Sequence, residues 1–301
     1  MSRSEARAQA VFEITTGEPI ALAKMGFSKR NYDAFLDIIA KPYGIVFVCG
    51  PTGSGKTTTL HSALGHINKP DRKIWTAEDP VEITQLGLRQ VQVHHKIGFD
   101  FAAAMRSFLR ADPDVIMVGE MRDKETTHIG IEASLTGHLV FSTLHTNSAP
   151  ESITRLLDMG MDPFNFADAI LGVLAQRLVR SLCKHCKKPY NPSEPEYDEL
   201  VREYDKEAFK KVKIPYTKDL ILYKPMGCPQ CNNTGYLGRM AIHELLVASD
   251  EIKRLIQQKA PMELMRDTAM QEGMSTLKQD GIEKIFQGHT DLVEVRKVCI
   301  K

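Results

Sequence analysis

Residues 50–58 have the types and spacing of a loop that binds phosphate. They read GPTGSGKTT, fit the pattern GxxxxGK[ST] and follow YGIVFVC, a short apolar run typical of a buried strand. Glycines let such a loop turn its N–H groups inward, and Lys56 would reach the β and γ phosphates. Thr57 would bind Mg²⁺ where the next helix begins. A glycine-rich turn without function is the alternative. The predicted nucleotide-binding residues are Gly50, Pro51, Thr52, Gly53, Ser54, Gly55, Lys56, Thr57 and Thr58.

A carboxylate ends a second apolar run. The segment DPDVIMVGEMRD, residues 112–123, contains a predicted strand that ends in Gly119 and Glu120. In a phosphate-loop protein, a carboxylate in this position holds Mg²⁺ directly or through a water. Asp is the commoner residue, so Glu120 is a departure, and its longer side chain favours a contact through water. A solvated strand end is the alternative. We predict that Thr57 and Glu120 hold Mg²⁺.

An acidic segment follows another predicted strand. It reads WTAEDPVEI, residues 75–83, and carries Glu78, Asp79 and Glu82. Carboxylates this close repel one another unless a cation or a shared proton explains them. We predict that Glu82 activates the water that attacks the γ phosphate, and that Glu78 or Asp79 supports the metal. A polar loop that is acidic by chance is the alternative.

Two histidines flank a fourth strand, in LTGHLVFSTLHTNSA. His138 and His145 are seven positions apart, so they face opposite sides of a regular strand. One could sense the γ phosphate while the other is structural. His145 is the candidate sensor, because it lies with Thr143 and Thr146 at the end of the strand.

Composition limits the class of protein. The chain has 301 residues, 43% of them hydrophobic, and its 39 Lys and Arg nearly balance 38 Asp and Glu. The net charge of +1 gives no overall attraction for nucleic acid or anionic membranes. No run approaches the roughly 18 apolar residues that span a bilayer, and the start lacks a signal-peptide core. We expect a cytosolic protein.

Strands and helices alternate over residues 44–182, which predicts an α/β fold with a mostly parallel sheet. Ligands bind such sheets at the carboxyl ends of the strands, where Gly50, Glu78, Glu120 and His145 lie. Two helices, over 149–160 and 163–182, are predicted to close the core, with Ser148 and Asp162 as N-terminal caps. A charged helix is expected over 197–212, and the chain reads as helical again from residue 241.

Four of the six cysteines form two CxxC pairs, Cys183 with Cys186 and Cys228 with Cys231. Four thiolates can hold one structural Zn²⁺, and closing the long intervening loop costs only a few kcal/mol against roughly 10 to 16 kcal/mol from zinc binding. Two redox pairs are the alternative. Cys49, beside the phosphate loop, and Cys299 should be free.

Five motifs in order carry a resemblance to a known family: GPTGSGKTTTL, AEDPVE, LRADPDVIMVGEMRD, TGHLVFSTLHTN and CKHC…CPQC…GYLGRMAIHELL. Together they resemble the type II secretion and type IV pilus assembly ATPases, which are hexameric RecA-like motors. The resemblance covers about residues 35–301. It implies Walker A roles for Lys56 and Thr57, the Walker B role for Glu120 and the catalytic role for Glu82. His138 and His145 match the family's paired histidines, and Arg155 and Arg239 match arginines that reach the nucleotide.

The resemblance also implies cofactors, partners and domains. It implies ATP, Mg²⁺ and Zn²⁺, a homohexamer, an inner-membrane platform protein as partner, no nucleic acid, and a cytoplasmic location at the inner face of the membrane. Retraction motors lack the four cysteines, so an assembly or export motor is favoured. The expected domains are a short N-terminal segment (1–34), a RecA-like core (35–182), a zinc subdomain (183–240) and a C-terminal helical subdomain (241–301). Family members usually carry further N-terminal domains, and the sequence leaves open whether this chain is part of a longer protein.

Two other functions remain open at this point. A nucleic-acid translocase with a zinc module would need a basic patch with interleaved aromatics, for which CKHCKK is the only candidate. A nucleotide switch that assembles on ATP without hydrolysing it would be distinguished by steady-state turnover. The sequence does not identify the cargo, pilin or pseudopilin, or the platform protein.

Overall fold

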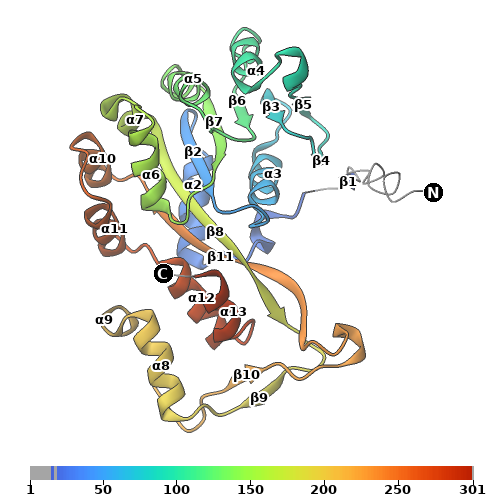
Figure 1. Ribbon diagram of the computed structural model, residues 1–301, viewed down its shortest axis with the longest axis vertical. Coiled ribbons are helices and arrows are strands. Elements are labelled where there is room, and N and C mark those ends of the chain that lie inside the picture. The colour runs from blue at the N-terminus through green and yellow to red at the C-terminus, as the bar shows by residue number, and fades with distance from the viewer. Residues whose placement is uncertain (1–14, 17–18, 300–301) are drawn as a thin grey trace.

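A seven-stranded sheet organises the larger part of the protein in a computed structural model, which describes residues 15–16 and 19–299 (Figure 1). The strand order is β11-β8-β2-β7-β6-β3-β5. All neighbouring strands are parallel except β8 and β11, so the predicted mostly parallel α/β sheet is confirmed. The strands are β2 (Gly44–Cys49), β3 (Ile74–Glu78), β5 (Leu88–Gln92), β6 (Val115–Val118), β7 (Leu139–Leu144), β8 (Ile170–Leu182) and β11 (Tyr236–Val247).

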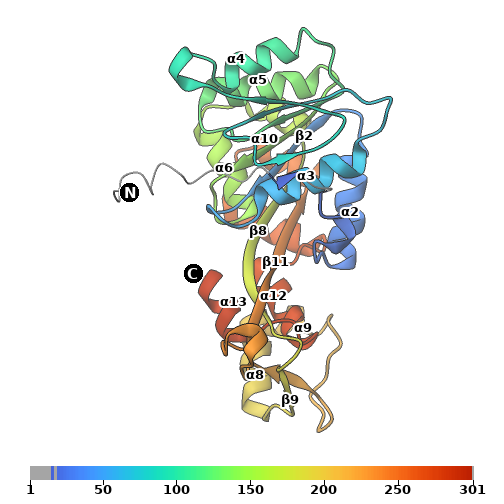
Figure 2. The same cartoon turned by 90° about the vertical axis from the view of Figure 1, so that its right-hand side faces the viewer.

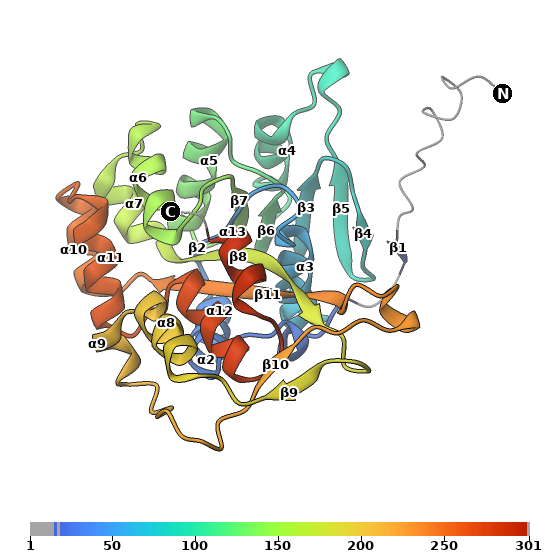
Figure 3. The same cartoon turned by 60° about the horizontal axis from the view of Figure 1, so that its bottom comes forward.

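Helices cover both faces of this sheet, which explains why β2 is a continuous apolar run. Alternate side chains of a strand point to opposite faces. Ile45 and Phe47 pack into one buried cluster, and Val46 and Val48 pack into another. Figure 3 shows the helices on the two sides. One face is covered by α2 (Lys29–Ile39) and α3 (Lys56–Ile67), and the other by α4 (Phe101–Phe108), α5 (Lys124–Leu135), α6 (Ala149–Asp158), α7 (Pro163–Ala169), α10 (Asp250–Gln257) and α11 (Met262–Gln271).

The single helix predicted over residues 163–182 is wrong. Ser148 and Asp162 do cap α6 and α7, but α7 ends at Ala169 and the long strand β8 follows. The Ala, Leu, Gln and Arg of this segment favour a helix locally. Pairing with β2 on one side and with β11 on the other overrides that preference. Residues 241–247, also expected to be helical, belong to β11 for the same reason.

A smaller part of the protein lies beyond the sheet, and β8 and β11 extend into it (Figure 2). It has its own core, which includes Tyr204, Phe209, Ile282 and Val295. The charged helix expected over 197–212 is interrupted at Asp205, whose φ is 91°. The elements of this part are β9 (Lys188–Tyr190), α8 (Glu194–Tyr204), α9 (Lys206–Phe209), β10 (Leu222–Lys224), η3 (Pro229–Cys231), α12 (Leu277–Phe286) and α13 (Leu292–Val298).

The N-terminal segment joins the larger part at the edge of the sheet. β1 (Thr15–Thr16) pairs with β4 (Ile83–Thr84), and η1 (Leu22–Lys24) precedes α2. The helix α2 crosses the expected domain boundary at residue 35 and buries Phe35. A last short helix, η2 (His95–Ile97), follows β5. Among the described residues, no helix has the length and apolarity to cross a membrane.

Candidate nucleotide and metal sites

The phosphate loop lies between β2 and α3, as its sequence predicts. Gly55 adopts a left-handed conformation with φ 86°, and a Cβ there would lie 2.8 Å from Gln176 Nε2, so glycine is required. The Lys56 ammonium donates hydrogen bonds to the carbonyl oxygens of Gly50 and Pro51, at 2.9 and 3.1 Å. Burial lowers the pKa of Lys56, although nearby Glu120 opposes this shift. The loop therefore places the Lys56 ammonium next to the N-terminus of α3.

A cleft of about 930 Å³ opens at the carboxyl ends of β3, β6 and β7. It brings together most of the predicted site: the loop, the acidic segment, and the carboxylate and histidine that follow β6 and β7. Gly50, Pro51 and Ser54 are not among its lining residues. The predicted residues that line it are Thr52, Gly53, Gly55, Lys56, Thr57, Thr58, Glu78, Asp79, Glu82, Glu120 and His145.

Glu120 contacts two basic residues of the cleft. Its side chain is 13% exposed and forms an ion pair with Arg122 and a contact of 3.1 Å with His145 Nε2. The hydrogen bond to Glu120 raises the pKa of Arg122. Arg122 also lines the cleft. Sequence reasoning missed it, although it lies only two residues beyond Glu120, because an isolated arginine carries no pattern.

The three residues of the acidic segment have different surroundings. Glu78 is buried, and its two oxygens accept hydrogen bonds from His61, Thr76 and Gln90. Burial would raise the pKa of Glu78, but these hydrogen bonds lower it below its usual value. Asp79 contacts His95 Nε2 at 3.0 Å. Glu82 is exposed on the wall of the cleft. Of the three carboxylates, only those of Asp79 and Glu82 are therefore exposed to solvent.

Three further predicted residues lie outside the cleft of this chain. His138 precedes β7, at the end of the strand opposite to His145, and its Nδ1 lies 2.9 Å from the carbonyl oxygen of Ala133. Arg155 is exposed on α6, and Arg239 is exposed on β11. None of the three lines the cleft. An arginine from these positions could reach a nucleotide only by crossing to another subunit or by a change in conformation.

The strand β8 supports the phosphate loop in a way that the sequence did not reveal. Gln176 donates to the carbonyl oxygen of Ser54 at 2.7 Å and accepts from the Thr59 hydroxyl at 2.7 Å. Arg177 donates to the carbonyl oxygen and the side-chain oxygen of Asn147, each at 3.1 Å. The helix predicted over residues 163–182 hides these contacts, because they depend on β8 lying beside β2.

Four cysteines meet at the end of the long strands. The Sγ atoms of Cys183, Cys186, Cys228 and Cys231 all lie within 4.8 Å of one another, and three of the pairs are 3.7 to 3.9 Å apart. Four thiolates around one ion at about 2.3 Å would lie about 3.8 Å apart, whereas a disulfide requires about 2.0 Å. The arrangement therefore fits one tetrahedral metal and not two disulfides.

Backbone donors surround these sulfurs. The N–H of Gly227 points to Cys186 Sγ, and those of Cys228 and Gly235 point to Cys231 Sγ, at 3.2 to 3.3 Å. Burial raises the pKa of Cys231, but hydrogen bonds from the peptide N–H groups of Cys228 and Gly235 and from the Cys228 and Cys186 thiols together lower it to about 6. Burial raises the pKa of the neighbouring Cys186 to about 11, so the favoured proton-free sulfur of the group is that of Cys231. A thiolate is the form that binds metal. Cys49 and Cys299 are free thiols, as expected.

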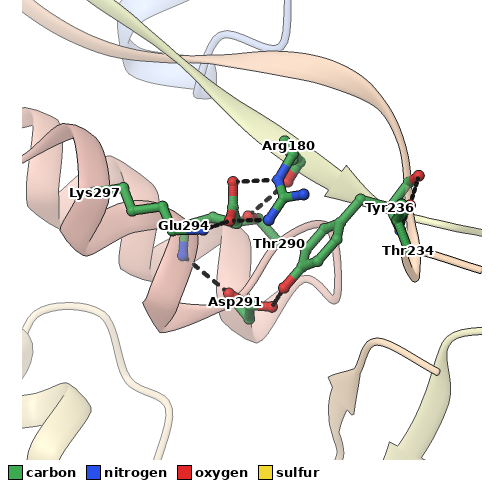
Figure 4. A network of polar contacts seen from close by, with 7 residues as sticks. All are labelled: Arg180, Thr234, Tyr236, Thr290, Asp291, Glu294 and Lys297. Carbon is green, nitrogen blue, oxygen red and sulfur yellow. Dashed lines mark hydrogen bonds and ion pairs between the residues drawn. The ribbon is translucent and has the colours of Figure 1, made fainter. Parts of the chain in front are cut away.

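A polar network next to the cysteines joins β8, β11 and α13 (Figure 4). Arg180 forms a two-pronged ion pair with Glu294, at 2.9 and 2.7 Å, and its guanidinium stacks on the ring of Tyr236. The hydrogen bond from Arg180 lowers the pKa of Glu294 to about 2. The Tyr236 hydroxyl donates to Asp291, which caps α13. The network ties the start of β11, at Tyr236, to β8 and α13. Arg239 lies three residues further along β11.

The chain is similar to secretion and pilus motors along most of its length. Residues 11–297 match the family described as Type II/IV secretion system protein. Type II secretion system ATPase E of Vibrio cholerae is 46% identical over 277 residues, or 92% of this chain and 52% of that protein. Type IV pilus assembly ATPase PilB of Myxococcus xanthus is 47% identical over 276 residues, or 91% and 47%.

A solved structure agrees with this similarity. The pilus retraction motor PilT with bound ADP has a TM-score of 0.68 and 27% identity, over 95% of this chain and 68% of that one. The chain spans about half or less of the length of the curated relatives it matches.

Proposed function

The chain belongs to the type II/IV secretion system protein family, and on that premise we propose that it is the motor part of an ATPase that powers pseudopilus or pilus assembly. One observation carries the proposal: Lys56 and Thr57 face Glu120, Glu82 and His145 across a single cleft. A phosphate loop, a metal-holding carboxylate and a candidate base are the groups that phosphoryl transfer to water requires.

The proposal gives a role to each of the five residues just named. The loop N–H groups and Lys56 bind the phosphates, and Lys56 exchanges its bonds to Gly50 and Pro51 for phosphate oxygens. Thr57 and Glu120 would hold Mg²⁺, which neutralises phosphate charge when bound. Glu82 orients the attacking water and accepts its proton, and His145 links Glu120 to the state of the γ phosphate.

We also propose a setting for this activity. The relatives are named as ATPases of type II secretion and of type IV pilus assembly. By analogy, the chain works as a ring of six copies at the inner face of the cytoplasmic membrane, against a platform protein. Arg155 and Arg239 lie outside the cleft of their own chain, which supports a site completed by neighbouring subunits.

We expect Mg²⁺-dependent ATP hydrolysis that is slow in the isolated chain. Phosphate release should be measured over a range of protein concentrations, with light scattering to detect rings. Turnover should stop when EDTA removes Mg²⁺, and Lys56→Ala should lose ATP binding because the loop loses its cation. If rings bind ATP with Mg²⁺ and release no phosphate, the protein is a nucleotide switch and the proposed hydrolysis is wrong.

We propose that the four cysteines hold Zn²⁺, and we expect one zinc per chain in purified protein. Cys228→Ser should lower the content to well under half an ion, because three thiolates bind zinc much more weakly than four. Cys299→Ser is the matched control and should keep the full content. Elemental analysis of both variants provides the measurement. Little zinc in the parent protein, together with thiols that oxidise readily, would instead support two redox pairs.

A further inference from the structure

Five polar side chains form a buried cluster behind the acidic wall of the cleft. We call it the His61 cluster, and its members come from α3, β3, β5 and the turn between β4 and β5. His61 is fully buried and Glu78 is 3% exposed. Burying so many polar groups is unfavourable unless their hydrogen bonds are made. The members are His61, Thr76, Glu78, Gln85 and Gln90.

Only one assignment of donors and acceptors is consistent with the contacts of His61. Gln85 Nε2 lies 2.9 Å from the carbonyl oxygen of His61 and 2.7 Å from its Nδ1. A carbonyl oxygen can only accept, so the amide nitrogen of Gln85 faces it, and the second hydrogen of that amide points to Nδ1. His61 Nδ1 is therefore an acceptor. His61 Nε2 carries the ring hydrogen and donates it to Glu78, at 3.0 Å.

The same cluster holds the backbone that follows Glu82. Gln90 Nε2 donates both to Glu78, at 3.0 Å, and to the carbonyl oxygen of Ile83, at 2.7 Å. The Gln90 side-chain oxygen accepts from the backbone N–H of Gln85, at 2.8 Å. The residues directly after Glu82 are thus held by Gln90, which is bonded to Glu78 and through Glu78 to His61 on α3.

These contacts form a chain between the two halves of the cleft. The helix α3 begins at Lys56, in the phosphate loop, and carries His61 five residues further on, about 1.4 turns along the helix. From His61 the bonds pass to Glu78 and Gln85, then to Gln90 and to the backbone at Ile83. Both carboxylate oxygens of Glu78 and the side-chain amides of Gln85 and Gln90 have hydrogen-bond partners in the protein. The cluster therefore resists movement of the Glu82 segment relative to α3.

We infer that His61, Gln85 and Gln90 are positioning residues that hold the Glu82 segment in register with the phosphate loop. The inference rests on the proposed function, in which Glu82 activates water, and it gives Glu78 a positioning role in place of support for the metal. A misplacement of about 1 Å can reduce a rate by about 100-fold without changing substrate binding.

The test compares His61→Leu, which removes both ring hydrogen bonds, with His61→Gln, whose amide restores a donor toward Glu78. We expect kcat to fall by about 10- to 100-fold in His61→Leu with the Kd for ATP within about threefold, and His61→Gln to recover most of kcat. Ser62→Ala is the matched control, because Ser62 is buried on the same helix and bonds to Thr58 O outside the cluster. It should keep the parent kcat.

A second measurement does not depend on turnover. Amide hydrogen exchange of residues 79–87 should accelerate by about tenfold or more in His61→Leu and in Gln90→Leu, while the rest of the protein stays protected. If His61→Leu does not fold, Gln90→Leu decides the question, because Gln90 lies on the edge strand β5. In a folded variant, unchanged exchange in this segment would overturn the inference, as would a loss of ATP binding that accompanies the loss of kcat.

The two proposals fail separately. If Glu82→Gln stops turnover while folded His61→Leu and Gln90→Leu keep the parent kcat, the positioning role is wrong and the proposed function stands. If Glu82→Gln keeps the parent kcat, the proposed role of Glu82 is wrong. Exchange in residues 79–87 then shows whether the cluster orders this segment.

Discussion

Replacing Glu82 with Gln is expected to reduce ATP turnover by about 100- to 10,000-fold and to leave the Kd for ATP within about threefold of the parent value. The amide keeps the size of the side chain on the cleft wall but cannot accept a proton from water. Binding should survive because the phosphate loop and Lys56 are unchanged. Phosphate release and the binding of a fluorescent ATP analogue, measured on the same preparation, separate the two effects.

The control for this variant is Glu132→Gln, an exposed glutamate on α5 that pairs with His128 and does not line the cleft. It should hydrolyse ATP at the parent rate. Parent turnover in Glu82→Gln would show that Glu82 is not the base and that the acidic segment has only a structural role. A loss of ATP binding would show instead that Glu82 contributes to binding ATP before the reaction.

Arg239→Ala is expected to reduce turnover by about 1,000-fold or more at protein concentrations where rings form. An arginine supplied from outside the phosphate loop can accelerate phosphoryl transfer by about 10³ to 10⁵. Arg239 pairs across the strands with Arg180, which is neutralised by Glu294. It lies on β11, which begins shortly after Cys231, the last of the four cysteines. The metal subdomain would therefore hold this arginine against a nucleotide, and release of phosphate would free it.

Zinc content should not change in Arg239→Ala, because Arg239 is not among the four cysteines of the metal site. We expect rings to persist as well, since the variant removes a single exposed side chain. Arg254→Ala is the matched control: this arginine is also exposed, but it pairs with Glu251 on α10. Elemental analysis, light scattering and turnover are measured together. Normal zinc, normal rings and undiminished hydrolysis would rule out the coupling between the metal subdomain and the nucleotide.

The sequence by itself determined the features that depend on neighbouring residues. The phosphate loop needs glycines and a lysine at fixed spacing, so its position before α3 follows from nine consecutive residues. The strands that end near Glu78, Glu120 and His145 are apolar on both faces, and parallel strands place their ends at one edge of a sheet. The shared cleft could be predicted from these facts, and so could a metal site from two CxxC pairs.

Tertiary structure decided the features that depend on partners distant along the chain. Residues 170–182 form a strand because β2 and β11 offer backbone hydrogen bonds that local helix preference cannot match. The roles of Glu78 and Gln176 were also hidden, since a buried side chain gains its meaning from the donors and acceptors that folding brings to it, and those donors have no fixed spacing in the sequence.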